Sequence, residues 1–432
     1  MSSPLLDDSV GELQSQVESL RKRIEELEAE NAKLSSRLSC CCCHQRVSPT
    51  KDISRSVVGT KGEIIKANGK KSSKVKGGSM LDLMNFPKRY VALRVTYFGQ
   101  RYYGFASEAQ QEPTVESELF KALEKTRLSI GDKRQAHYSR CGRTDKGVSS
   151  VGQVIALFLR SSLRDDSITN DREIDYVGVL NRVLPEDIRV TGWCPVTDGF
   201  SARFSCLSRE YKYFFWRNNL DTVSMKLACD KLVGEHDFRN FCKMDAVNVH
   251  NYRRHISSFT LSSCDRSYKG NELWAFHIKG SAFLWHQVRC MVAVLFMIGQ
   301  GIESPNVIDA LLDTEKTPRK PQYIMAPEVP LVLQSCQFEG LNFLCSSDAW
   351  KALHLHLENA ARDFELRAAI CNEALHKIFP KDHVIPDLTS LSNGTKRKPP
   401  SHIPLMQRPT EPSYDERQAK FKSNQEARGL PS

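Results

Sequence analysis

The chain has 432 residues, of which 40% are hydrophobic and 26% charged, as in folded globular proteins. This length allows roughly two to four structural units. The longest apolar run, Cys290 to Ile298, has nine residues, about half of what a membrane-spanning helix needs. The N-terminal residues resemble neither a signal peptide nor a mitochondrial transit segment, so the fourteen cysteines are expected to be reduced. We therefore expect a soluble protein of the nucleus or cytoplasm, with no membrane contact.

The net charge of +10 suggests a polyanionic partner, but it is spread unevenly along the chain. Residues 1–39 carry −3, residues 40–90 carry +8, and residues 380–432 carry +3. Only +2 remains for residues 91–379. A binding site for a polyanion in this central part must therefore arise from local clustering of basic side chains, not from a bulk excess.

Residues 1–39 show a heptad pattern that predicts a short coiled coil. Its d positions are Leu13, Leu20, Leu27 and Leu34, and its a positions are Val17, Ile24, Asn31 and Leu38. A single Asn at an a position favours a parallel, in-register dimer. The alternative is an isolated helix packed on its own protein. A leucine-zipper transcription factor is excluded because no basic helix precedes the heptads.

Residues 40–85 are predicted to form a basic flexible linker, since they are rich in Gly, Ser and Lys and lack apolar periodicity. Cys40 to Cys43 lie together here, without the second spaced ligand pair that a zinc site requires. We interpret them as exposed thiols. The lysines of the linker are either simply solvated or in contact with the phosphates of a polyanionic partner.

Residues 86–345 alternate between strand and helix patterns and predict an α+β body of two subdomains, 86–205 and 206–345. Strands are predicted at Tyr90 to Tyr97, Gln153 to Leu159, Ile188 to Trp193, Glu210 to Trp216 and Phe276 to Ile278. Helices are predicted after a Thr114 cap, at Ile174 to Leu184 and from about Trp285. A helical extension, 346–380, and a basic flexible tail, 381–432, follow.

The densest polar cluster runs from Cys141 to Val148 and forms a loop at the entrance of a strand. It places Asp145 between Arg143 and Lys146, with glycines on both sides. Nearby positive charge keeps a carboxylate ionised, and an ionised, positioned Asp is a competent nucleophile toward carbon. The alternative is an Asp satisfied by backbone N–H groups within a turn. No P-loop, G-x-S-x-G or H-E-x-x-H motif occurs.

The segment from Ser139 to Val148 resembles the catalytic loop of the TruA family of tRNA pseudouridine synthases. Further matches occur in the family's order at Tyr97 to Gly99, Tyr103 to Phe105, Phe200 to Ser205, Arg209 to Tyr213, Gly234 to Phe238, Gly280 to Leu284 and His286 to Arg289. Together they cover residues 88 to about 302. The resemblance implies a two-subdomain body with antiparallel sheets and flanking helices.

The resemblance also implies the roles of four residues. Asp145 is the expected nucleophile and attacks the target uridine at ribose C1′ or at C6 of the base. Tyr211 is the expected aromatic partner of the uracil, and Arg289 pairs with the catalytic Asp. Arg143 intrudes into the RNA to help extrude the base. Neither a metal nor a cofactor is expected, and His236, Asp237 and His286 are interpreted as structural.

Within the family, the chain is most similar to the eukaryotic branch that modifies positions 38 and 39 of the tRNA anticodon stem-loop. Phe105 to Ser107 and Asn240 to Asp245 carry this similarity. The family implies a homodimer that binds tRNA, which residues 13–38 could reinforce. Two other classes of protein compete with the enzyme: a non-catalytic tRNA-binding or tRNA-folding protein with the same fold, and a coiled-coil scaffold with an inert body.

Overall fold

The computed structural model describes residues 86–107, 111–129, 133–163, 173–378 and 402–426, together with Glu18, Arg21, Lys22, Glu25, Glu26 and Ala29. The chain divides into two compact units, Met1–Val75 and Lys76–Ser432. In the first unit, the six described residues are helical and exposed. The a and d positions of the predicted coiled coil lie outside the described residues, as do Cys40 to Cys43. The coiled coil therefore stays a prediction.

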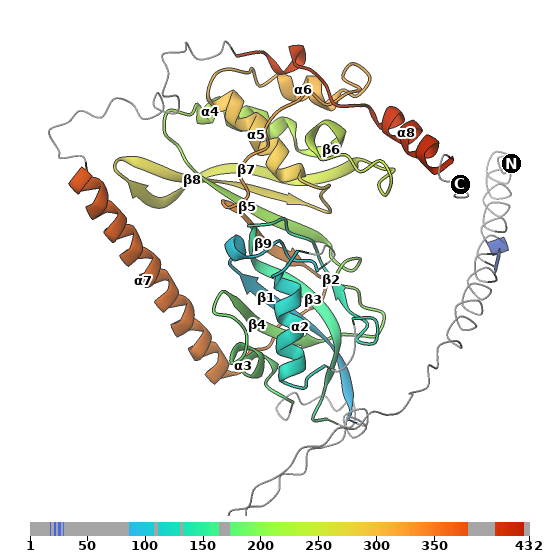
Figure 1. The fold of residues 1–432 in the computed structure, drawn as a ribbon, viewed down its shortest axis with the longest axis vertical. Helices are drawn as coiled ribbons and strands as arrows, with labels where there is room; N and C mark the ends of the chain where they lie inside the picture. Colours follow the sequence, from blue (N-terminus) through green and yellow to red (C-terminus); the bar gives the residue numbers. More distant parts are fainter. Residues whose placement is uncertain are drawn as a thin grey trace, which may run out of the picture. The chain divides into compact units, whose positions relative to one another are not determined.

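In the described part of the second unit, nine strands form one sheet in the order β4-β1-β3-β9-β5-β8-β7-β6, with β2 paired to β3 (Figure 1). The strands are β1 (Lys88–Tyr97), β2 (Ser139–Arg140), β3 (Ser149–Arg160), β4 (Ile188–Pro195), β5 (Ser208–Trp216), β6 (Gly234–Asp237), β7 (Arg253–Tyr268), β8 (Asn271–Gly280) and β9 (Leu331–Gln337). The helices that accompany the sheet are α2 (Val115–Lys125), α3 (Tyr176–Asn181), α4 (Thr222–Lys231), α5 (Gln287–Gly299), α6 (Val307–Leu312), α7 (Ser347–Ile378) and α8 (Tyr414–Glu426). Short 3₁₀ turns are η2 (Gly99–Arg101), η4 (Arg239–Phe241) and η6 (Leu405–Gln407). The predicted α+β class is confirmed.

The sheet differs from the expected antiparallel sheets in one pairing. The β3–β9 contact is parallel and pairs Ser149 with Val332 and Ser150 with Leu333. Ser150 Oγ also donates to the Leu333 carbonyl at 2.9 Å. This contact joins the two halves of the body in one continuous sheet. No local pattern could predict it, because the paired residues lie far apart in the sequence.

Each half of the sheet covers its own hydrophobic core. In the first half, Val91, Leu93, Val95 and Tyr97 of β1 are buried, as the alternation of that strand predicted. In the second half, the apolar run Cys290 to Ile298 lies in α5, which is buried almost along its whole length. The apolar run is therefore part of the hydrophobic core. No described helix is long and apolar enough to cross a membrane.

The sequence predictions for helices α2 and α3 agree with the structure to different degrees. Thr114 caps α2 by accepting a hydrogen bond from the Ser117 backbone N–H at 3.1 Å, and Ser117 Oγ accepts from the Thr114 N–H. The predicted cap is thus confirmed. The helix predicted at Ile174 to Leu184 is shorter, because Asp175 caps it and the helix ends at Asn181, where a turn toward Pro185 begins.

Part of the predicted flexible tail is packed on the body. Leu405 is fully buried, and its backbone N–H donates to Glu303 at 2.7 Å. Thr410 forms a β-bridge with Pro321. The α8 residue Tyr414 packs edge-on against Tyr252, with ring centroids 5.8 Å apart. Residues 402–426 therefore differ from the tail that composition predicted, because a few apolar anchors suffice to hold a polar segment.

A buried carboxylate connects α2 with the strand that leads to the Asp145 loop. Glu116 is fully buried and pairs with Lys133 and with Arg140, the latter at 2.8 Å. The Ser107 backbone N–H donates to the same carboxylate at 2.9 Å. Burial alone would raise the pKa of Glu116, but these partners hold it below its ordinary value of 4.5.

Replacing Glu116 with Gln should destabilise the fold by about 2 kcal/mol at neutral pH, because the partly buried Arg140 and the half-exposed Lys133 lose their counter-charge. A lowered carboxylate pKa stabilises the fold above the ordinary pKa, and this contribution is lost as the pH falls through the folded value. The difference from the wild type should therefore shrink below pH 4.5. Urea unfolding would measure both effects. Glu118 lies in the same turn but pairs with the exposed Lys121, so Glu118→Gln should lower the free energy of unfolding by less than about 1 kcal/mol. Equal losses in the two variants would contradict the stabilising role of the Glu116 carboxylate.

Candidate active site

The loop from Cys141 to Val148 is fixed at its start by the adjoining strand β3. The Cys141 N–H donates to the Val154 carbonyl at 2.8 Å. The Gln153 side chain binds both sides of Gly142: its oxygen accepts from the Gly142 N–H at 3.2 Å, and its amide donates to the Gly142 carbonyl at 2.9 Å. Because Gln153 is buried, these bonds give the loop a rigid base.

The middle of the loop is held in place by contacts with Tyr97, Gly104 and Phe105. Tyr97 OH and Thr144 Oγ1 are 2.8 Å apart in a buried hydrogen bond, and the Phe105 N–H donates to the Thr144 carbonyl at 3.1 Å. Gly104 has φ +96°, and a Cβ there would lie 2.8 Å from the Thr144 oxygen. Only glycine permits both that backbone angle and that approach. The geometry directs Asp145 out of the loop into the cleft.

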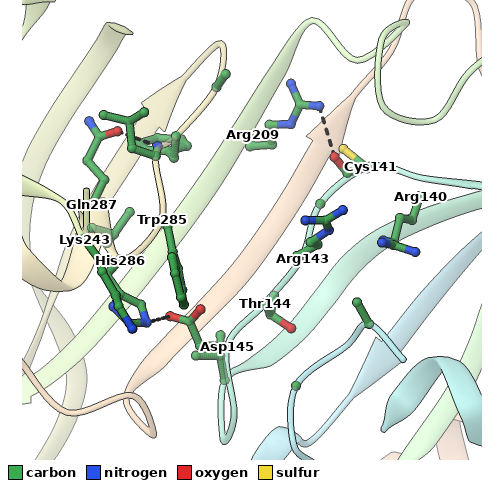
Figure 2. A pocket seen from close by; sticks show the side chains of 18 of the residues that line it. Arg140, Cys141, Arg143, Thr144, Asp145, Arg209, Lys243, Trp285, His286 and Gln287 are labelled. Atoms are coloured by element: carbon green, nitrogen blue, oxygen red, sulfur yellow. Dashed lines mark hydrogen bonds and ion pairs between the residues drawn. The ribbon is translucent and has the colours of Figure 1, made fainter. Parts of the chain in front are cut away.

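Two side chains from the start of α5 face Asp145. His286 Nε2 lies 3.4 Å from Asp145 Oδ2, and Arg289 Nη1 lies 3.6 Å from the same oxygen. Figure 2 shows Asp145 and His286 pointing at each other from opposite walls of the cleft. The structure thus brings Arg289 to Asp145, as the resemblance implied, and adds a histidine to that contact.

Arg289 is oriented by more than Asp145. Its Nε donates to the Ala326 carbonyl at 2.8 Å, and its Nη2 pairs with Glu328 at 2.8 Å. The side chain is only 9% exposed, so its direction is fixed. Sequence reasoning missed Glu328, which lies just before β9 and carries no motif of its own.

His286 is held in a left-handed conformation, with φ 62°, immediately before α5. Burial lowers the pKa of its imidazole despite the attraction of Asp145, so the ring is neutral near neutral pH. The sequence interpretation treated His286 as structural; the available signal was its position three residues before Arg289, on the same side of a helical turn. His236 and Asp237 contact Val233 and Arg239, outside the cleft.

The two candidate tyrosines of β5 occupy different environments. Tyr211 lines the cleft and packs edge-on against Phe283, with ring centroids 5.1 Å apart. Burial raises the pKa of its phenol, which keeps the ring uncharged. Tyr213 is buried, and its hydroxyl donates to the Pro327 carbonyl at 3.0 Å. Tyr213 is therefore a core residue, and Tyr211 is the one available to a ligand.

Arg143 is exposed and lines the cleft beside Arg140, as Figure 2 shows. The cleft encloses about 1340 Å³, larger than a typical small-molecule pocket. Its basic lining residues are Arg140, Arg143, Lys146, Arg203, Arg209, Lys243, Arg254 and Arg289, and its acidic ones are Asp145, Asp245 and Glu328. Basic side chains are thus concentrated here, although the central part of the sequence carries almost no net charge. Such a cleft suits a polyanion.

Comparison with known proteins agrees with this chemistry. A family profile described as tRNA pseudouridine synthase matches residues 228–339. The tRNA pseudouridine(38/39) synthase of Bos taurus is 44% identical over 362 residues, which are 79% of this chain and 71% of that protein. The Homo sapiens protein of that name is 43% identical, covering 80% and 71%. The Saccharomyces cerevisiae protein is 40% identical, covering 82% and 78%.

The matching profile and these relatives place the chain, with its basic cleft, among RNA-modifying enzymes of the isomerase class. More particularly, the chain belongs to the TruA family of tRNA pseudouridine synthases.

Replacing Arg289 with Gln should lower kcat by about 10²–10³ and change tRNA affinity little, because this nearly buried arginine acts on the site and not on RNA. Single-turnover rates and filter binding would separate the two quantities. Arg254→Gln is the matched control, since Arg254 lines the cleft but contacts the backbone carbonyls of Asn251 and Arg253. Equal loss of kcat in both variants would contradict a specific role for Arg289.

Proposed function

We propose that this protein isomerises uridine to pseudouridine at positions 38 and 39 of the tRNA anticodon stem-loop, with Asp145 as the nucleophile. The observation that carries the proposal is the placement of Asp145 at the tip of a rigid loop, against His286 and Arg289, inside a basic cleft. Three relatives from animals and yeast, named for positions 38/39, support the choice of site.

The reaction requires no redox change or group transfer. The Asp145 carboxylate attacks the uridine at C1′ or at C6, and the C1′–N1 bond breaks. The freed uracil turns, and C5 bonds to C1′; the bond between Asp145 and the nucleotide breaks, which returns its electron pair to the carboxylate. The C5 proton then leaves to solvent and N1 gains one, so atoms and electrons balance within the nucleotide.

Arg289 holds the proposed nucleophile in place. A fixed guanidinium attracts a nearby carboxylate and orients it. At 3.6 Å the contact is weaker than the 2.8 Å pair between Arg289 and Glu328. The contact therefore orients Asp145, yet its oxygen stays accessible for attack.

Tyr211 provides an uncharged aromatic surface for the uracil ring. Its edge-on contact with Phe283 fixes the plane of the ring. A base held against Tyr211 is excluded from bulk water while it turns. The burial that raises the pKa of Tyr211 also keeps its hydroxyl protonated and able to donate a hydrogen bond to the base.

Reaching the target requires extrusion of the nucleotide, because a stacked base hides its glycosidic bond. Arg143 is exposed beside Asp145 and is suited to enter the RNA at that point. Two exposed aromatic residues of the cleft, Phe204 and Trp285, offer stacking surfaces for bases. Each has a basic neighbour over its ring, Arg203 and Lys243 respectively.

The competing function is a tRNA-binding or tRNA-folding protein that performs no chemistry. Such a protein would need the basic cleft but not an Asp145 fixed between a cleft arginine and a histidine. The two functions differ in one observable, because only isomerisation releases the hydrogen at uridine C5.

Asp145→Asn should abolish tritium release from tRNA labelled at uridine C5, a loss of about 10⁴ or more, because an amide cannot act as the nucleophile. Asp237→Asn is the control, since Asp237 also pairs with an arginine but lies outside the cleft. If wild-type protein released no tritium from any tRNA, the proposed isomerase activity would be wrong. Substrates in which uridine 38 or 39 is replaced by cytidine would test the positions.

We further propose a homodimer in which α7 contributes to the contact. This 32-residue helix exposes seven large apolar side chains, more than a helix facing only water usually carries. They are Trp350, Leu355, Phe364, Leu366, Ile370, Leu375 and Ile378. A second copy of the chain would cover such a surface with an equivalent one.

Leu366→Lys combined with Ile370→Lys should raise the dimer dissociation constant by about 100-fold or more, because two charges would be buried at the contact. Sedimentation equilibrium would measure it. Ile324→Lys, which changes a more exposed isoleucine outside α7, is the matched control. A variant that lacks residues 1–39 distinguishes the contribution of the predicted coiled coil from that of α7. If this deletion abolished the dimer and the α7 substitutions did not, the α7 contact would be contradicted.

A further inference from the structure

Three cysteine side chains from separate segments meet at the edge of the cleft. Cys141 begins the catalytic loop, Cys206 precedes β5, and Cys336 lies in β9. Their Sγ atoms all lie within 4.8 Å of one another. Cys141 and Cys206 are less than 10% exposed. We call these three residues the thiol cluster; it is the one group of potential metal ligands of this size among the described residues.

The spacing of the thiol cluster matches a metal centre better than a disulfide. Zinc binds thiolate sulfur at about 2.3 Å, which places tetrahedral sulfur ligands about 3.8 Å apart. Sulfur atoms within 4.8 Å need only small side-chain movements to reach that distance. A disulfide would join two of the three at about 2.05 Å and leave the third thiol unused.

Charge also favours a dication. The Arg209 guanidinium donates to the backbone carbonyls of Cys141 at 3.1 Å and Cys206 at 3.4 Å, so its positive charge lies beside the cluster (Figure 2). Three thiolates with Zn²⁺ carry −1, and Arg209 brings the total to zero. Three thiolates with a monovalent soft cation would leave a buried negative charge, which is costly.

Arg209 also preorganises the ligands. Besides the two cysteine carbonyls, it binds the carbonyls of Arg203 and Ser281 at 2.7 and 2.6 Å. One side chain therefore fixes the backbone shortly before Cys206, at Cys206 and at Cys141. Binding a metal here would order few additional residues, which favours affinity.

Packing alone is the competing explanation, because buried cysteines often act as small apolar residues. The thiol cluster does adjoin apolar side chains such as Ala92, Val154 and Ala202. Cys194 is buried among the same residues, yet it is not part of the cluster. Packing explains Cys194, whereas convergence of three sulfur atoms is what a metal site requires.

We propose that Cys141, Cys206 and Cys336 bind a structural zinc ion, each losing its thiol proton to solvent. Cys141 lines the cleft, so water can supply the fourth ligand. The ion would tie the catalytic loop to the segments around β5 and β9. The sequence indicated no metal because these cysteines are widely separated and form no C-x-x-C pair.

Elemental analysis of the full-length protein, purified from zinc-containing medium and dialysed, should find one zinc per chain. Cys206→Ser combined with Cys336→Ser should lose it. Cys194→Ser should keep its zinc. A variant in which Cys40 to Cys43 are replaced by serine should also keep it, which would show that this run of cysteines does not bind the metal. Zinc lost only with Cys40 to Cys43 would overturn the proposal, as would zinc retained by the double variant.

Cobalt substitution gives a second readout that does not depend on the double variant folding. Chelated wild-type protein and Cys194→Ser should each take up one Co²⁺ and show the thiolate charge-transfer absorption and ligand-field bands of a tetrahedral site, which zinc then abolishes. Absence of stoichiometric zinc together with absence of these bands would overturn the proposal. So would a disulfide within the thiol cluster in protein isolated under thiol-blocking conditions.

Discussion

The contact between Asp145 and the start of α5 is the constraint on which the rest of the structure depends. Asp145 belongs to the first half of the body, whereas His286 and Arg289 belong to the second. An oxygen–nitrogen contact of 3.6 Å across two halves requires both to be held in one frame. The parallel pairing of β3 with β9 supplies that frame, because it continues one sheet through the junction.

The loop that carries Asp145 is anchored to that frame at both ends and in the middle. Gln153 and the Val154 carbonyl hold its start on β3, and Tyr97 of β1 holds Thr144. At its end, the Gly147 N–H donates to the Tyr102 carbonyl at 3.2 Å. Because the groups that hold Asp145 lie on strands and in buried positions, its placement costs little entropy when a substrate binds. A site on a mobile loop would lose conformational entropy each time a substrate bound.

Sequence predicted the local features of this molecule and missed the non-local ones, for physical reasons. Alternation of apolar residues located β1, and the Thr114 cap located α2, because both signals depend on neighbours within a few residues. The roles of Asp145 and Arg289 came from resemblance, and the structure places them in contact. Glu328, the β3–β9 pairing and the thiol cluster could not be predicted, since each depends on contacts between distant segments.

The sharing of Arg289 between Glu328 and Asp145 bears on the proposed role of Asp145 as the nucleophile. A carboxylate that pairs closely with an arginine is stable as an anion but is a weaker nucleophile, because its charge is already compensated. Glu328 takes the short 2.8 Å contact, and Asp145 keeps the 3.6 Å one. The neutral imidazole of His286 adds a polar neighbour without a second positive charge. Asp145 thus lies near the positive charge of Arg289, while the oxygen proposed to attack is not held in a tight ion pair.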